Sequence, residues 1–186
     1  MKKTVLIVLA GLATAASAEV LLEVDLSVAN SITITATNGL SDVTVTGSTF
    51  TGALLADFFT GAGGAGFVDS GGVGTLTSAA NASDGSPGIF NSGGNFGLNI
   101  WAWTADSDSD FTAGSVAFAG SATWAVDAVD YADMLAGNTS GNIYFAADTD
   151  DDIPSARILG TWNVVPAPSA LALLGLGGIA AGRRRR

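Results

Sequence analysis

Apolar and polar residues alternate along the chain soon after residue 20. Residues 21–28 place leucine or valine at every even position, and residues 32–36 alternate isoleucine with threonine. A period of two is the pattern of half-buried β-strands. The dipeptide Asn38-Gly39 then predicts a turn or a hairpin, and residues 43–46 alternate valine with threonine. This region therefore predicts an antiparallel sheet.

Short strand patterns separated by turn residues continue through the rest of the chain. We predict them at residues 67–68, 96–104, 116–126, 142–146 and 158–164. Residues 51–59 fit either one face of a helix or a short buried strand, and residues 126–135 fit one or two helical turns. Many short strands with frequent turn signals are typical of all-β domains. The predicted fold is mainly β, an antiparallel β-sandwich or jelly-roll-like domain.

Two tryptophans lie on one face of the strand predicted at residues 96–104. Trp101 and Trp103 alternate with Ile100 and Ala102, and Asn99 falls on the tryptophan face. Such rings either stack on sugar rings or fill the core with the other face outside. Packing is the commoner role of aromatic side chains, and the sequence leaves both open.

The N-terminus has the three parts of a secretory signal peptide. Lys2 and Lys3 are its positive start, residues 5–13 are apolar, and Ala16 and Ala18 form a small-residue cleavage site. We predict cleavage after Ala18, which makes Glu19 the first residue of the exported chain. The general secretion machinery is therefore a predicted partner.

The C-terminus also has three parts in a fixed order. A stiff Pro-X-Pro element comes first, an uncharged apolar run over residues 169–182 follows, and four arginines end the chain. The prolines favour extended backbone, the run can enter a bilayer as a short helix, and arginines stay on the cytoplasmic side. The run is short for a permanent anchor, since a helix of this length rises only about 21 Å against a hydrocarbon core of about 30 Å. The predicted motif residues are Val165, Pro166, Ala167, Pro168, Ser169, Arg183, Arg184, Arg185 and Arg186.

This tail resembles the PEP-CTERM sorting signal of exported proteins of Gram-negative bacteria. The resemblance implies that an exosortase, an integral membrane protease, recognises the Pro-X-Pro element and removes the tail. It also implies an association with exopolysaccharide and biofilm, which are typical of the family. The chain departs from the family at Ala167, where glutamate is usual. The resemblance covers the tail alone.

Composition excludes several classes of function. The chain has no Cys and no His, so disulfides, Ser-His-Asp or Cys-His catalysis and zinc sites built on these residues are excluded. Between Glu19 and Pro168 the only basic residue is Arg157, whereas all 17 acidic residues of the chain lie there. So acidic a body is a poor nucleic-acid binder, because phosphate contacts need lysine and arginine. A mechanism based on two carboxylates stays open, but we assign no catalytic residue.

Two acidic clusters follow predicted strands and suggest calcium as an optional cofactor. Their candidate ligands are Asp106, Asp108, Asp110, Asp148, Asp150 and Asp152. Calcium binds six to eight oxygens of the kind that such loops supply. The clusters lack the glycine and the distal glutamate of an EF-hand loop. The alternative is two solvated acidic loops.

These observations predict three segments: a signal peptide at residues 1–18, a β-rich extracellular domain at 19–164 and a sorting tail at 165–186. The leading hypothesis is an exported, non-enzymatic surface or matrix protein of a Gram-negative bacterium. It would pass through an inner-membrane intermediate and then reach the cell surface or the extracellular polysaccharide. The alternative is an exported carbohydrate-binding module or a carboxylate-dependent glycan-active enzyme.

Overall fold

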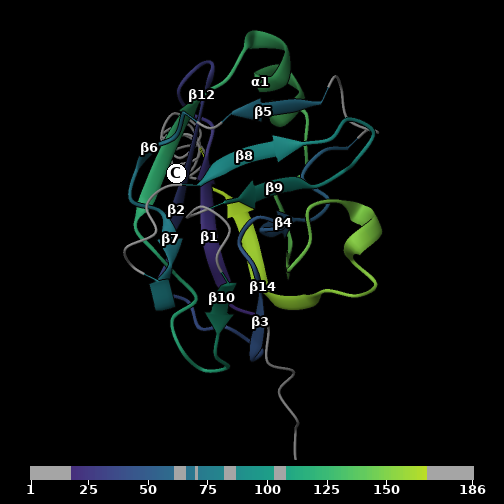
Figure 1. The fold of residues 1–186 in the computed structure, drawn as a ribbon. Coiled ribbons are helices and arrows are strands. Elements are labelled where there is room, and N and C mark those ends of the chain that lie inside the picture. Colours follow the sequence, from purple (N-terminus) through teal and green to yellow (C-terminus); the bar gives the residue numbers. More distant parts are fainter. Residues whose placement is uncertain (1–17, 61–65, 70, 82–86, 103–107, 167–186) are drawn as a thin grey trace, which may run out of the picture.

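The computed structural model describes residues 18–60, 66–69, 71–81, 87–102 and 108–166. This part of the chain is mainly β, as the sequence predicts, and most of its strands form one curled, largely antiparallel sheet (Figure 1). In spatial order the sheet contains β5 (Phe67–Asp69), β8 (Gly88–Asn91), β9 (Leu98–Trp101), β4 (Ala53–Leu55), β13 (Ser140–Phe145), β14 (Arg157–Val164), β1 (Val20–Asp25), β2 (Ser31–Ala36), β12 (Ser121–Ala125) and β6 (Val73–Gly74).

The sheet has one parallel pairing among the described strands, between β1 and β14. Two short antiparallel ribbons flank it. They pair β3 (Val45–Ser48) with β10 (Asp108–Phe111), and β7 (Thr77–Ser78) with β11 (Phe118–Ala119). The described helices are η1 (Ala79–Asn81), α1 (Ala128–Leu135) and η2 (Asp150–Asp152).

The curl of the sheet brings its two ends together around one core. In Figure 1, β5, β8 and β9 run roughly horizontally, whereas β1, β2 and β12 run roughly vertically. Trp124 on β12 is fully buried, and its indole N–H donates a 3.1 Å hydrogen bond to the carbonyl of Pro87, just before β8. Buried rings fill the space between, with Phe58 and Trp162 5.0 Å apart and Phe111 and Phe145 4.8 Å apart.

The structure settles several details that the pattern left open or misjudged. Residues 51–59 contain the buried strand β4, and α1 lies in the predicted helical segment. The hairpin alternative for Asn38-Gly39 is wrong, because β2 pairs with β1 and β12 while β3 pairs with β10. Val28 was expected on the buried face but is 64% exposed. Val28 is exposed because a turn ends β1 at Asp25. In this turn the backbone N–H of Ser27 donates to the Asp25 carboxylate.

The membrane-entering helix predicted for the tail lies outside the described residues, as does most of the predicted signal peptide. Among the residues that the structure does describe, no helix is both long and apolar enough to cross a bilayer.

Candidate functional site

Strand β14 carries the chain directly from the sheet into the predicted sorting tail. Val164 donates its backbone N–H to the carbonyl of Thr139 at 2.7 Å, and Val165 donates to the carbonyl of Val24 at 2.9 Å. Pro166 follows and is exposed. Proline has no N–H and cannot extend the ladder of hydrogen bonds. The hydrogen-bonded body therefore reaches Val165, and the described chain leaves the sheet at Pro166.

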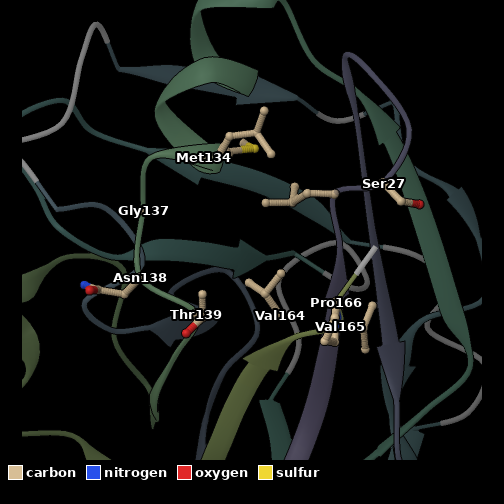
Figure 2. A pocket seen from close by; sticks show the side chains of 10 residues that line it. Ser27, Met134, Gly137, Asn138, Thr139, Val164, Val165 and Pro166 are labelled. Atoms are coloured by element: carbon tan, nitrogen blue, oxygen red, sulfur yellow. The ribbon is translucent and has the colours of Figure 1, made fainter. Parts of the chain in front are cut away.

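A small cavity lies at this root of the tail (Figure 2). Its volume is about 170 Å³, and it lies between the end of β14, the end of α1 and the loop after β1. Leu26, Met134, Val164 and Val165 supply apolar walls. The first residues of the tail thus form part of a groove whose walls are mainly apolar.

Helix α1 forms the upper wall of the groove, and its ends are well defined. The side chain of Asp127 caps its N-terminus by accepting the backbone N–H groups of Val129 and Asp130 at 2.8 and 2.9 Å. Such a cap satisfies N–H groups that have no partner inside the helix. Tyr131 donates its hydroxyl to the carbonyl of Leu26. The helix is thereby tied to the end of β1, next to the exit of the tail.

The first turn of α1 is acidic and carries a perturbed carboxyl group. Partial burial raises the pKa of Asp130 above its ordinary value, and the charges of Asp127 and Asp133 raise it further. Protonation of Asp130 is therefore easier than that of an isolated aspartate. Its contribution to stability is present at acidic pH and is lost as the pH rises through the raised pKa.

The predicted start of the exported chain is hydrogen-bonded to the sheet, directly before β1. The carbonyl of Glu19 accepts the backbone N–H of Thr161 at 2.9 Å, and its carboxylate accepts the backbone N–H of Leu40 at 2.6 Å. Ala18 is the first described residue, whereas Ala16 lies outside the described residues. Cleavage after Ala18 stays a prediction, and it would leave these contacts of Glu19 in place.

The first acidic cluster is spread along a strand. Asp108 and Asp110 are exposed on β10, with the buried Ser109 between them, and Asp106 lies outside the described residues. The carboxylate of Asp110 accepts a hydrogen bond from the hydroxyl of Thr46 on the paired strand β3. This group therefore already has a neutral partner.

The second cluster surrounds η2, where its carboxylates accept backbone N–H groups. Asp150 accepts from Phe96 at 2.7 Å, and Asp152 accepts from Asp148 at 3.1 Å. Burial raises the pKa of Asp148, and a hydrogen bond to the Asp152 carboxylate and its charge raise it further. The backbone N–H of Asp148 lowers the pKa of Asp152.

No group of three or more acidic side chains within the described ranges is placed to hold a metal ion. Asp108, Asp110 and the second cluster lie within these ranges, whereas Asp106 lies outside them. Calcium binding at the predicted ligands stays a prediction.

A second cavity, of about 230 Å³, was missed by the sequence analysis. It is lined by Phe50, Phe90, Asn99, Trp101 and Asp148. The residues come from β8, β9 and the segments before β4 and after β13, so no local pattern collects them. The available signal was Asn99, an amide in a strand of otherwise apolar and aromatic residues. Trp103, expected beside Trp101, lies outside the described residues.

Comparison with known proteins gives one match. Residues 164–186 match the PEP-CTERM protein-sorting motif. Neither the curated proteins nor the solved structures contain a match to the chain. The tail is therefore a PEP-CTERM sorting motif, as its three parts predicted, and it supports export and sorting of the chain by exosortase.

Proposed function

We propose that this chain is a non-enzymatic surface or matrix protein that exosortase releases from the inner membrane and that associates with extracellular polysaccharide. The observation that carries the proposal is the junction at Val165, where the hydrogen-bonded body ends one residue after the matched motif begins. A cut directly after Val165 would remove the motif from Pro166 onward and leave every hydrogen bond of β14 intact.

The charge distribution supports release rather than permanent anchoring. Removal of the tail takes away the four C-terminal arginines and the apolar run. With the predicted signal peptide also removed, the single basic residue of the body is Arg157. A high net charge keeps such a body dispersed. Before the cut, the arginines would hold the end of the tail on the cytoplasmic side, so that the body folds against the outer face of the membrane.

The carboxylates near the second cavity support binding rather than turnover. A glycosidase places two carboxyl groups on opposite sides of the scissile bond, about 5–9.5 Å apart. Among the described residues that line the cavity, Asp148 is the one carboxylate. Its neighbour Asp152 is hydrogen-bonded to it and does not face it across the space. The carbohydrate-binding alternative is thus favoured over the enzymatic one.

The test of sorting is the mass and location of variants in the producing bacterium. Replacing Pro166 and Pro168 by Ala should leave full-length precursor in the inner membrane, because the recognition element is lost while the apolar run remains. Pro154→Ala is the matched control, since Pro154 is exposed and lies outside the motif. Replacing Arg183 to Arg186 by Ser should release uncut protein.

Intact-mass analysis of the membrane and medium fractions reads out all three variants. Normal processing of both tail variants would overturn the sorting role. Association with the matrix is measured separately, by co-sedimentation of the processed protein with polysaccharide from the same bacterium. Failure to co-sediment would leave a sorted protein with another destination.

A further inference from the structure

The second cavity combines an aromatic wall with a buried polar side chain. Phe50 and Trp101 meet edge to face, with centroids 5.5 Å apart and planes at 87°. Phe50 is 60% exposed, although an aromatic ring gains by burial. Phe90 lies beside them, on the strand paired with that of Trp101. The wall is thus an apolar surface that solvent reaches.

Asn99 provides an unpaired acceptor next to this wall. Its side chain is 0% exposed, and its Nδ2 donates to the carbonyls of Thr51 and Ala147, at 2.9 and 2.8 Å. These bonds fix the orientation of the amide and turn its oxygen away from both carbonyls. The Oδ1 atom has no hydrogen-bond partner among the described residues. A buried acceptor without a partner costs roughly 1–3 kcal/mol, which a donor on a ligand would recover.

The size and charge of the cavity restrict that ligand. Its volume of about 230 Å³ lies below the roughly 300–1,000 Å³ of pockets for drug-sized molecules, so one compact ring fits better than a large cofactor. Asp148 at the rim and the acidic body disfavour anions. The wall suits an apolar C–H face, Asn99 suits a hydroxyl donor, and Asp148 suits a second hydroxyl.

We infer that this cavity binds one neutral sugar ring, stacked on the exposed ring of Phe50 and touching Trp101 at its side, with one hydroxyl donating to Asn99 Oδ1. The inference rests on the proposed association with extracellular polysaccharide, for which it names the contact. Asp148 accepts from a neighbouring hydroxyl and gives the site its preference for uncharged sugars.

The test uses the processed protein purified from the producing cells. Tryptophan fluorescence and proton NMR follow its titration with hexasaccharides of glucose, galactose, mannose and N-acetylglucosamine, and with glucuronate as the anionic probe. We expect at least one neutral probe to bind and glucuronate to bind more weakly. Phe50→Ala should weaken binding by about tenfold, as expected for the loss of one aromatic contact.

Matched variants separate the site from the fold. Phe96→Ala removes another exposed phenylalanine, outside the cavity lining, and should bind like the parent. Trp101→Phe keeps an aromatic ring and should bind the neutral sugars more weakly than the parent but more tightly than Phe50→Ala. Asp148→Asn should narrow the difference between neutral sugars and glucuronate. Melting curves check that each variant is folded.

The outcomes distinguish this inference from the proposed function. If no neutral probe binds the parent protein, the sugar site is overturned, whatever the tail variants show. If the probes bind equally to the parent and to Phe50→Ala, the association with polysaccharide stands but its site lies elsewhere. Loss of binding in Phe50→Ala with the Phe96→Ala control unchanged supports the inference.

Discussion

Trp162 and Trp101 pack against the sheet in the same way but differ in burial and in hydrogen bonding. Each indole lies over a glycine of a paired strand. A Cβ atom on Gly141 would lie 2.7 Å from Trp162 Nε1, and one on Gly88 would lie 2.7 Å from Trp101 Nε1. Trp162 is fully buried, and its N–H donates to the carbonyl of Ala56 at 3.1 Å.

Trp101 lacks both of these features. Its ring is half-buried and lines a cavity, and its N–H has no acceptor among the described residues. The glycine contact thus places an indole against a sheet but does not distinguish a fully buried tryptophan from a half-buried one. The two tryptophans differ in how fully other residues cover the ring and in whether the indole N–H has an acceptor. Trp162 therefore belongs to the core, whereas the region around Trp101 has room for a ligand.

The largest expected effect is on stability. Trp162→Ala should lower the free energy of unfolding by about 3–5 kcal/mol, as for large core residues. Trp101→Ala should cost about 1–2 kcal/mol, because less apolar surface is buried. Urea denaturation of the processed protein measures both. Equal losses would mean that Trp101 is a core residue, and the comparison would fail.

The glycine pair sharpens the same comparison. An alanine at residue 141 would place its Cβ 2.4 Å from the carbonyl oxygen of Ala56, the acceptor of the Trp162 N–H. Backbone cannot move aside easily, so Gly141→Ala should cost about 1–3 kcal/mol. At Gly88 the closest atom belongs to the Trp101 ring, which has open space beside it.

Gly88→Ala should therefore cost less stability than Gly141→Ala but change the tryptophan fluorescence and weaken sugar binding. The two variants are compared by urea denaturation and by the titration above. If Gly88→Ala is the more destabilising of the two, the Trp101 ring is held more firmly than its exposure indicates.

A smaller effect is expected from the carboxyl group at the rim. The raised pKa of Asp148 means that this group favours the folded state when protonated, and that this contribution is lost as the pH rises through the raised pKa. Asp148→Asn should then stabilise the protein by a few tenths of a kcal/mol at neutral pH, since the group is mostly exposed and screened.

The gain from Asp148→Asn should vanish well below pH 3.9, the ordinary aspartate pKa, where Asp148 is protonated. Asp152, whose pKa is lowered, behaves in the opposite sense and loses its contribution as the pH falls. Unfolding curves across pH for the parent and Asp148→Asn measure the gain from the substitution and the loss of the Asp152 contribution at low pH. A gain that is the same at every pH would exclude titration of Asp148 as its cause.

Calcium should have the smallest effect. Asp150 and Asp152 already accept backbone N–H groups, and Asp110 accepts from Thr46. We expect millimolar calcium to raise the melting temperature only slightly, and magnesium less. If calcium raised the melting temperature by as much as Gly141→Ala lowers it, Asp106 and the two clusters would form a calcium site.

Local patterns predicted those features that depend on neighbours in the sequence. The alternation in β1 and β2 gave the buried faces with Leu22, Val24, Ile32 and Ile34 correctly, because one side of the sheet faces the core. The order of prolines, apolar run and arginines was enough to predict the sorting motif. Both are properties of a short stretch of chain.

Pairings between distant segments could not be predicted in this way. The ribbon of β3 with β10 and the parallel contact of β1 with β14 depend on the whole chain. The second cavity has the same origin, since Phe50 and Asp148 approach Trp101 only through β4, β9 and β13. No spacing along the chain links these residues.

The position of β14 also sets an order of events during export. This strand lies in the middle of the sheet, between β1 and β13, yet it is the last described strand along the chain and would be the last of them to cross the membrane. Pairing between the two ends of a chain is slow because a long loop must close first. On the proposed route, a tail that halts in the membrane would keep the chain in place during this delay. Release by the protease would then come after the sheet is complete, which protects a half-formed sheet with open strand edges from aggregation.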